Sequence, residues 1–258
     1  MNVAVFASGN GNNLLTAIKT AELFPDELKI VLVVTDRLEI PAIEIAKNYG
    51  LTVIAKNFEK ECGVWEECKH SQVKTRLYQE AAKRFHDDIL DEIKTYQQMR
   101  GSIINLVALS YHRLIRGKLL KYFQDKIINQ HPADLAVMKD KNHFQRKYVG
   151  LSGLFKSLKD GKTKTRTCNF IVRKGLDDGE ILCSGPWVNY QGPLPVTRKS
   201  AWNHELRQKK LSDQPCLKFV LIAISRGRYG IHRTKKHPDG NKVITFDGQP
   251  LRYQGIDL

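Results

Sequence analysis

The residues best suited to chemistry lie at the end of a predicted strand, in the segment Ile127-Ile128-Asn129-Gln130-His131-Pro132. Side chains alternate along a strand, so Asn129 and His131 would project from the same face. An asparagine amide can donate a hydrogen bond to a developing oxyanion, and a histidine can move a proton near neutral pH. The pair suits acyl transfer and requires a third group to orient the imidazole. A strand end with a satisfied histidine is the simpler alternative for this segment alone.

A second candidate site follows the first predicted strand, where a loop rich in glycine and asparagine leads into a predicted helix. The loop residues are Gly9, Asn10, Gly11, Asn12 and Asn13. Glycine lets the backbone approach a ligand closely, and the N–H groups at a helix N-terminus bind anions. The loop matches neither the dinucleotide fingerprint nor a Walker A loop. It therefore predicts a site for a single phosphate, with a plain tight turn as the alternative.

The elements that would position these residues alternate between strands and helices. Apolar runs predict strands at residues 3–6, 29–35, 51–55, 103–109 and 126–130, and helices at 43–49, 77–84, 89–96, 119–123 and 154–158. Strands at 167–172, 181–184, 219–224 and 243–246 would follow. This alternation predicts an α/β fold, with a Rossmann-like, mostly parallel twisted sheet flanked by helices and a C-terminal β-hairpin.

The chain shows no internal repeat and no clear linker. We therefore expect a single domain over residues 1–258, with a catalytic α/β core at 1–200 and a helix and hairpin extension packed on it at 201–258.

Charge is spread unevenly along the chain, which carries +15 in total. Residues 1–100 have a balance of −2, from 13 basic against 15 acidic residues, and residues 101–258 have +17, from 29 against 12. This predicts a polyanionic partner near the Asn/His pair, such as a phosphorylated small molecule, a polyglutamyl cofactor or RNA. A solvated lysine-rich surface is the alternative.

The five cysteines are scattered and odd in number, which is typical of a reducing cytosol. Cys62, Cys68 and His70 do not match the spacing of a zinc site, so we expect no metal. The N-terminus lacks the features of a signal peptide, and no apolar run reaches membrane-spanning length. We expect a cytoplasmic protein, a monomer or homodimer, with no membrane partner.

Three pieces of sequence, in this order, resemble the folate-dependent formyltransferases. They are Ser8-Gly9-Asn10-Gly11-Asn12-Asn13-Leu14, Asn129-x-His131-Pro132 and Leu176-Asp177-x-Gly179. The segment 110–115 and the tail 246–255 agree further. Within these enzymes the resemblance is closest to the phosphoribosylglycinamide (glycinamide ribonucleotide) formyltransferases, and it implies the formyltransferase fold.

The resemblance implies a role for each matching residue. Asn129 would bind the formyl oxygen and its oxyanion, His131 would assist proton transfer, and Asp177 would hold and charge-stabilise His131. A carboxylate beside a histidine favours the imidazolium, which agrees with that role. An ordinary Asp/Gly turn is the alternative for Asp177.

The same resemblance implies two binding segments. The loop Gly9–Asn13 would hold the substrate phosphate through its N–H groups. The pterin pocket of 10-formyltetrahydrofolate, the implied co-substrate, would be lined by Arg113, Leu114, Ile115, Leu120 and Val172. Core packing is the alternative for the apolar members of this set.

The sequence departs from the family pattern near the expected amine acceptor. The family continues Pro-Ser-Leu-Leu-Pro after its histidine, whereas this chain has Pro132-Ala133-Asp134-Leu135. Ser152 stands where the family often has histidine, and Thr167-Cys168-Asn169-Phe170 replaces a Thr-Ser-Val-His strand. Inserts lie at about 57–101 and 134–149. The second insert resembles a lid or substrate loop and carries Lys139, Lys141, Arg146 and Lys147.

The expected function is transfer of a formyl group from 10-formyltetrahydrofolate to a primary amine of a phosphorylated small molecule, glycinamide ribonucleotide in purine synthesis. The departures leave another amine open, such as a nucleotide-linked amino sugar or a hydroxyornithine-type siderophore precursor. An RNA-binding protein is an alternative from another class, but no RNA-recognition signature supports a nucleic-acid partner. An inactive folate-binding descendant would not need Asn129, His131 and Asp177 intact.

Overall fold

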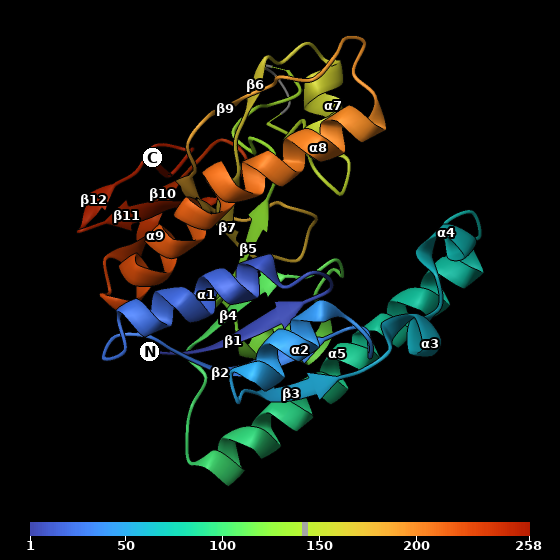
Figure 1. The fold of residues 1–258 in the computed structure, drawn as a ribbon, viewed down its shortest axis with the longest axis vertical. Helices are drawn as coiled ribbons and strands as arrows, with labels where there is room; N and C mark the ends of the chain where they lie inside the picture. The colour runs from blue at the N-terminus through green and yellow to red at the C-terminus, as the bar shows by residue number, and fades with distance from the viewer. Residues whose placement is uncertain (141–143) are drawn as a thin grey trace. The chain divides into compact units, whose positions relative to one another are not determined.

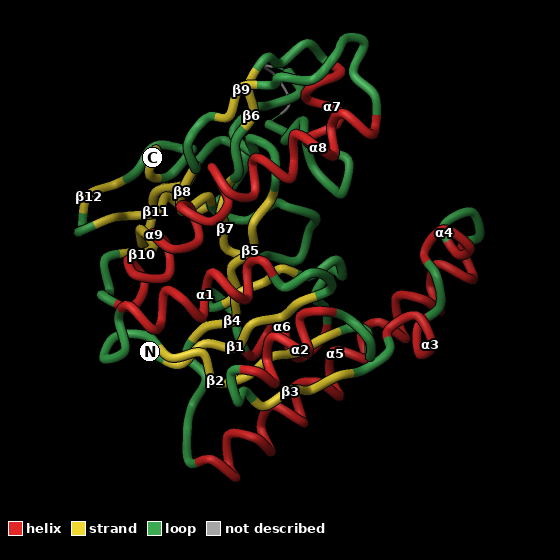
Figure 2. Tube along the Cα trace, in the orientation of Figure 1, coloured by secondary structure: helices red, strands yellow, loops and turns green. Residues whose placement is uncertain are grey.

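The computed structural model describes residues 1–140 and 144–258, and Lys141 of the predicted substrate loop lies outside these residues. The chain divides into two compact units. Unit 1 comprises residues 1–18 and 29–127, and unit 2 comprises residues 19–28 and 128–258. Figure 1 labels the elements along the chain, and Figure 2 shows how helix, strand and loop alternate.

Unit 1 contains the four parallel strands of the main sheet. They are β1 (Asn2–Ala7), β2 (Lys29–Thr35), β3 (Thr52–Ala55) and β4 (Leu106–Ser110), in the order β4-β1-β2-β3. Residues 3–7 of β1 are buried without alternation, as expected for a central parallel strand covered on both faces. The carboxyl ends of these strands carry the loops that hold the predicted phosphate and pterin segments.

The helices of unit 1 include a long one formed by the first insert. The helices are α2 (Pro41–Asn48), α3 (Phe58–Cys62), α4 (Trp65–Cys68), α5 (Gln72–Arg100) and α6 (Gly117–Tyr122), while α1 (Asn12–Leu23) begins in unit 1 and ends in unit 2. Ser71 caps the start of α5 and Gly101, in the left-handed conformation, ends it. Its second half buries an apolar stripe that includes Phe85, Ile89 and Ile93. The two helical segments predicted within this insert are therefore parts of one helix.

Unit 2 contains the strand that carries the Asn/His pair. Its main-sheet strands are β5 (Ile127–His131), β7 (Cys168–Ile171), β8 (Ile181–Ser184) and β13 (Ile256–Asp257), in the order β13-β8-β7-β5. Strand β7 runs antiparallel to β5 and β8, whereas β13 is parallel to β8. Short strands β6 (Lys164–Thr165) and β9 (Val188–Asn189) form a separate pair. The predicted hairpin is present as β10 (Tyr229–Lys236) and β11 (Lys242–Phe246), with β12 (Gln249–Pro250) beside it.

The helices of unit 2 correct one predicted strand. They are α7 (Gly153–Lys159), α8 (Arg198–Gln208), a π-helical segment η1 (Lys209–Asp213) and α9 (Gln214–Ser225), which packs on β7 and β8. The predicted strand 219–224 is wrong, because these residues lie within α9. A short apolar run cannot distinguish a buried strand from a buried helix. The burial of Cys216, Leu217, Val220 and Leu221 follows helical spacing.

The predicted fold class is confirmed by the main sheet, which has eight strands, mostly parallel, with helices flanking it. No helix among the described residues is long and apolar enough to cross a membrane.

Truncation to alanine should destabilise the protein in the second half of α5 and have almost no effect in the first half. Ile89 is 0% exposed and Leu77 is 58% exposed. We expect Ile89→Ala to lower the free energy of unfolding by about 2–5 kcal/mol, because it leaves a cavity. Leu77→Ala should stay within about 0.5 kcal/mol of the parent. Urea unfolding followed by circular dichroism measures both changes, and equal losses would contradict this packing of the helix.

Candidate functional site

Strand β5 presents Asn129 and His131 on one face and Gln130 on the other. The Nε2 atom of Gln130 donates to the backbone oxygen of Asp213 over 3.0 Å, which fixes its side of the strand. His131 is buried, at 4% exposure, whereas Asn129 is partly exposed. Among the described residues, none forms a hydrogen bond with the side-chain amide of Asn129. This amide is therefore free to bind an incoming group.

Both ring nitrogens of His131 face acceptors of unit 2. Its Nε2 lies 2.6 Å from the backbone oxygen of Tyr148, and its Nδ1 lies 3.4 Å from Oδ2 of Asp177. A carbonyl oxygen can only accept, so Nε2 carries the proton of the neutral ring. The basic nitrogen is therefore Nδ1, which faces the carboxylate.

The surroundings of His131 favour its neutral form, and two nearby acceptors offset part of that preference. Burial lowers the pKa of His131, and the Asp177 carboxylate and the Tyr148 carbonyl offset part of that effect. The resting ring is therefore neutral near pH 7. A proton taken up at Nδ1 would lie between the ring and a carboxylate, which is the arrangement that holds an imidazolium best.

Asp177 reaches His131 from a tight turn. Its backbone has φ of 50°, a left-handed conformation that aspartate tolerates better than most residues. The N–H of Gly150 donates to Oδ2 over 2.8 Å, which orients the carboxylate. Within the described parts of the chain, Oδ1 forms no hydrogen bond. The structure thus brings Asp177 to His131, and leaves one carboxylate oxygen for a water or ligand.

The segment 148–153, at the end of the second insert and just after it, packs on His131 and was missed by sequence reasoning. A Cβ atom on Gly153 would lie 2.6 Å from Nε2 of His131 and 2.5 Å from the Tyr148 oxygen, so only glycine fits there. Tyr148 and Gly150 contribute backbone atoms, and backbone contacts leave no signature in residue type. The one available signal was the pair of glycines at 150 and 153, which lies beside Ser152, a position where the sequence departs from the family.

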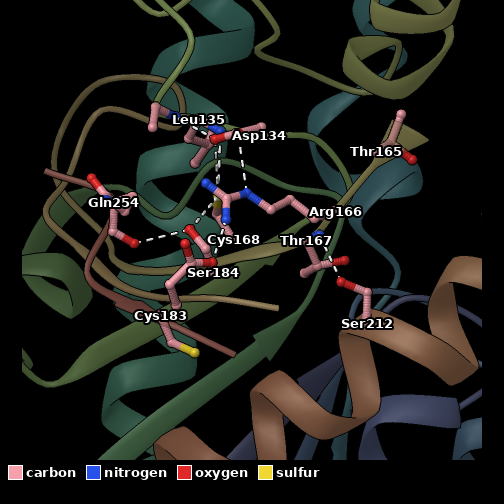
Figure 3. Close-up of polar contacts among 12 residues, drawn as sticks. Asp134, Leu135, Thr165, Arg166, Thr167, Cys168, Cys183, Ser184, Ser212 and Gln254 are labelled. Carbon is pink, nitrogen blue, oxygen red and sulfur yellow. Dashed lines mark hydrogen bonds and ion pairs between the residues drawn. The ribbon is translucent and has the colours of Figure 1, made fainter. Parts of the chain in front are cut away.

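The departures after His131 are held by a polar network of their own, drawn in Figure 3. Asp134 accepts from Nε of Arg166 over 3.0 Å, and the Leu135 N–H donates to Sγ of Cys168 over 3.3 Å. Arg166 also donates to Asp257 in β13 over 2.6 Å. An ion pair therefore secures this loop, where the family uses a second proline.

The predicted phosphate loop, Gly9 to Asn13, connects β1 to α1 in unit 1. Gly11 has φ of 72°, and a Cβ there would lie 2.7 Å from Cδ1 of Ile45, so the loop requires glycine. Asn10 and Asn12 are exposed. Among the described residues, none accepts from the backbone N–H of Gly11 or Asn12. These donors remain available to an anion.

In the predicted pterin segment, the arginine side chain is bound within the protein, whereas the backbone of Leu114 is unpaired among the described residues. Arg113 donates to Asp36 over 2.6 Å and to Glu59 over 2.9 Å, and its guanidinium lies 4.5 Å from the centre of the Phe58 ring. Its side chain is therefore committed to the protein. The backbone of Leu114 forms no hydrogen bond with another described residue, so its N–H and C=O can bind a ligand edge.

The apolar residues of the predicted pterin set differ in burial. Ile115 is buried, and Leu114 and Leu120 are partly exposed in unit 1. Val172 is buried in unit 2, directly after β7. Unpaired backbone groups beside apolar side chains, as at Leu114 and Ile115, suit a flat heterocycle with a polar edge.

Comparison with known proteins identifies the family of this chain. The sequence matches the formyl transferase family over residues 1–185. The chain belongs to this family. It is a folate-dependent N-formyltransferase, and its co-substrate is derived from folate.

The similar formyltransferases span most of the chain. Phosphoribosylglycinamide formyltransferase from Bacillus subtilis (strain 168) is 25% identical over 180 residues, which cover 69% of this chain and 75% of that protein. The structure of phosphoribosylglycinamide formyltransferase from Coxiella burnetii matches with a TM-score of 0.70 and 21% identity, over 100% of this chain and 99% of that chain. Glycinamide ribonucleotide transformylase 1 from Symbiobacterium toebii gives 0.67 and 17%, over 95% and 93%. At these identities, the two structures show a shared fold.

Gly153 provides a test of how closely the chain packs on His131. Alanine usually stabilises a helix relative to glycine by about 1 kcal/mol. We expect Gly153→Ala to do the opposite and lower the melting temperature, because its Cβ would clash with the ring and the Tyr148 oxygen. Ser152→Ala is the matched control, since the Ser152 side chain forms no capping bond. A Gly153→Ala protein as stable as the control would contradict this geometry.

Proposed function

We propose that this formyltransferase transfers the formyl group of 10-formyltetrahydrofolate to the primary amine of a phosphorylated small molecule, with glycinamide ribonucleotide as the acceptor. The observation that carries the proposal is the unpaired Asn129 amide on the same strand face as a buried His131, whose Nδ1 lies 3.4 Å from Asp177. The phosphoribosylglycinamide formyltransferase from Bacillus subtilis supports this choice of acceptor.

Asn129 would supply the electrostatic part of the reaction. As the amine nitrogen attacks the formyl carbon, the carbonyl electron pair moves onto the formyl oxygen. The Asn129 amide donates to that oxygen as its charge develops. Because the amide has no competing partner among the described residues, it needs no rearrangement before it binds the oxyanion.

His131 and Asp177 would move the proton. The attacking amine must lose a proton, and N10 of the folate must gain one as its bond to the formyl carbon breaks. Oδ1 of Asp177 can hold the water that carries this proton, and Nδ1 of His131 can store it next to Oδ2. The amine thus becomes a formamide, and tetrahydrofolate leaves with the proton on N10.

The two segments of unit 1 would bind the ends of the two substrates. The unpaired N–H groups of the loop Gly9–Asn13 would hold the acceptor phosphate. The Leu114 backbone would read the pterin edge, with Ile115 and Leu120 against the ring, and Arg113 would hold this segment in shape.

One observation favours a different amine as the alternative acceptor. Phe170 pairs with Asn129 across β5 and β7 and is 2% exposed. Partners in register project to the same face, so an apolar ring lies beside the oxyanion donor at a position where the family has histidine. A nucleotide-linked amino sugar or a hydroxyornithine-type precursor is therefore the second candidate.

Removing any of the three catalytic groups should abolish turnover and preserve the fold. We expect Asn129→Ala, His131→Ala and Asp177→Ala to lower kcat at least 100-fold, since one oxyanion donor is worth about 3 kcal/mol. Gln130→Met, on the same strand but facing away, is the matched control and should keep its activity. Tetrahydrofolate release measures the rate, and full activity in a variant would remove that residue from the mechanism.

The acceptor and the donor can be tested separately. We expect 10-formyltetrahydrofolate to raise the melting temperature, because it binds only the folded state. Glycinamide ribonucleotide, an amino-sugar nucleotide and hydroxyornithine should then be compared for acceptor-dependent release of tetrahydrofolate. The first should react fastest. Release at the same rate without any amine would indicate hydrolysis and contradict the transfer.

A further inference from the structure

The second insert carries a buried arginine that forms hydrogen bonds with the backbone of the turn that carries Asp177. Arg146 is 7% exposed, and its guanidinium donates to the backbone oxygens of Asp177 and Gly179, the latter over 2.6 Å. Its Nε donates to the hydroxyl of Tyr253 over 2.9 Å. These hydrogen bonds engage all three guanidinium nitrogens with oxygen acceptors of unit 2.

No carboxylate of the described chain contacts Arg146 directly. Burying a cation without an opposite charge in contact is costly, and here neutral oxygens and the Tyr253 ring, whose centre lies 5.4 Å from the guanidinium carbon, offset that cost. A guanidinium is planar and presents its donors in a fixed fork. Because the two carbonyls that it holds are two residues apart, this fork fixes the backbone of the turn between them.

The remaining carbonyl of that turn is also held. Nδ2 of Asn241, from the loop between β10 and β11, donates to the backbone oxygen of Asp178 over 2.6 Å. Three consecutive carbonyls, at residues 177–179, are therefore fixed by Arg146 and Asn241. The hydroxyl of Tyr253 donates in turn to Asp239, which belongs to the same loop as Asn241. The loop of the C-terminal hairpin thus also supports this turn.

The same short stretch of chain also contacts the side chains of His131 and Asp177 directly. Tyr148 faces Nε2 of His131 with its carbonyl, and Gly150 donates to Oδ2 of Asp177. Residues 146–150 therefore touch the histidine, the carboxylate and the turn that carries the carboxylate. A displacement of about 1 Å at such a pair can cost 100-fold in rate.

We propose that Arg146 is a positioning residue, and that the described end of the insert, residues 144–149, serves to hold Asp177 against His131 instead of binding the substrate. The proposal depends on the proposed role of Asp177. Arg146 acts through the turn, and its positive charge adds to the effect of burial, which lowers the pKa of His131. Its own contacts with substrate are not required.

The test compares Arg146→Gln with Arg228→Gln in the full chain. Arg228 forms an exposed ion pair with Asp247 and serves as the control, so its variant should match the parent. For Arg146→Gln we expect kcat to fall about 10- to 100-fold, while KM for both substrates stays within about twofold. The acidic limb of the kcat profile should move to higher pH, because loss of the positive charge favours protonation of His131. Arg146→Lys should recover part of kcat.

A second variant covers the possibility that Arg146→Gln does not fold. Asn241→Ala removes one hold on the same turn and leaves Arg146 in place, so it should lower kcat by a smaller factor without changing KM. A folded Arg146→Gln or Asn241→Ala protein with parental kcat and an unmoved pH profile would overturn the proposal. A rise in KM with unchanged kcat would also overturn it, because it would indicate substrate binding.

Asp177→Asn separates this proposal from the proposed function. If Asp177→Asn is inactive and Arg146→Gln is fully active, the positioning role alone is wrong. If Asp177→Asn is itself fully active, the proposed role of the carboxylate fails and the positioning role fails with it.

Discussion

The contact between a buried imidazole and a buried carboxylate is the constraint that shapes unit 2. His131 and Asp177 are both nearly inaccessible to water, so the hydration that each loses must be replaced by the other and by backbone groups. At 3.4 Å the pair is close enough for strong attraction when the ring is protonated. When the ring is neutral, its Nδ1 lone pair faces the carboxylate without a proton between them. Burial therefore opposes protonation of the ring, and Asp177 partly offsets that effect.

Such a pair needs a rigid frame, and the chain provides one mostly through backbone atoms. The Tyr148 carbonyl fixes the tautomer of His131, the Gly150 N–H orients the carboxylate, and Gly153 lets the chain pass over the ring. Backbone groups lose little conformational freedom when they bind, and they cannot be replaced one at a time by mutation. Among the described residues, the side chains of Arg146 and Asn241 hold the turn directly, so variants of these two can alter the frame without changing the pair itself.

The sequence allowed prediction of the parts whose chemistry is local. Alternation along β5 was sufficient to pair Asn129 with His131, and the Gly/Asn loop needed only its residue types. Family resemblance supplied the distant Asp177, which no local pattern connects to His131. The frame was beyond reach, because a carbonyl such as that of Tyr148 has the same chemistry in every residue. The strand predicted at 219–224 failed for a different reason, since a short buried run has no distinguishing period.

The composition of the two inserts suggests charged side chains that are available to ligands, whereas several of these side chains pair within the protein. The basic residues of the second insert suggest contact with an anion, yet Arg146 is buried on carbonyls and Lys147 pairs with Asp160 over 2.6 Å. In the first insert, Phe58 and Glu59 of α3 engage Arg113, at the start of the predicted pterin segment. In each case a charged group added to the fold is used internally. A positive charge balance therefore overstates how many of these cations can meet a ligand.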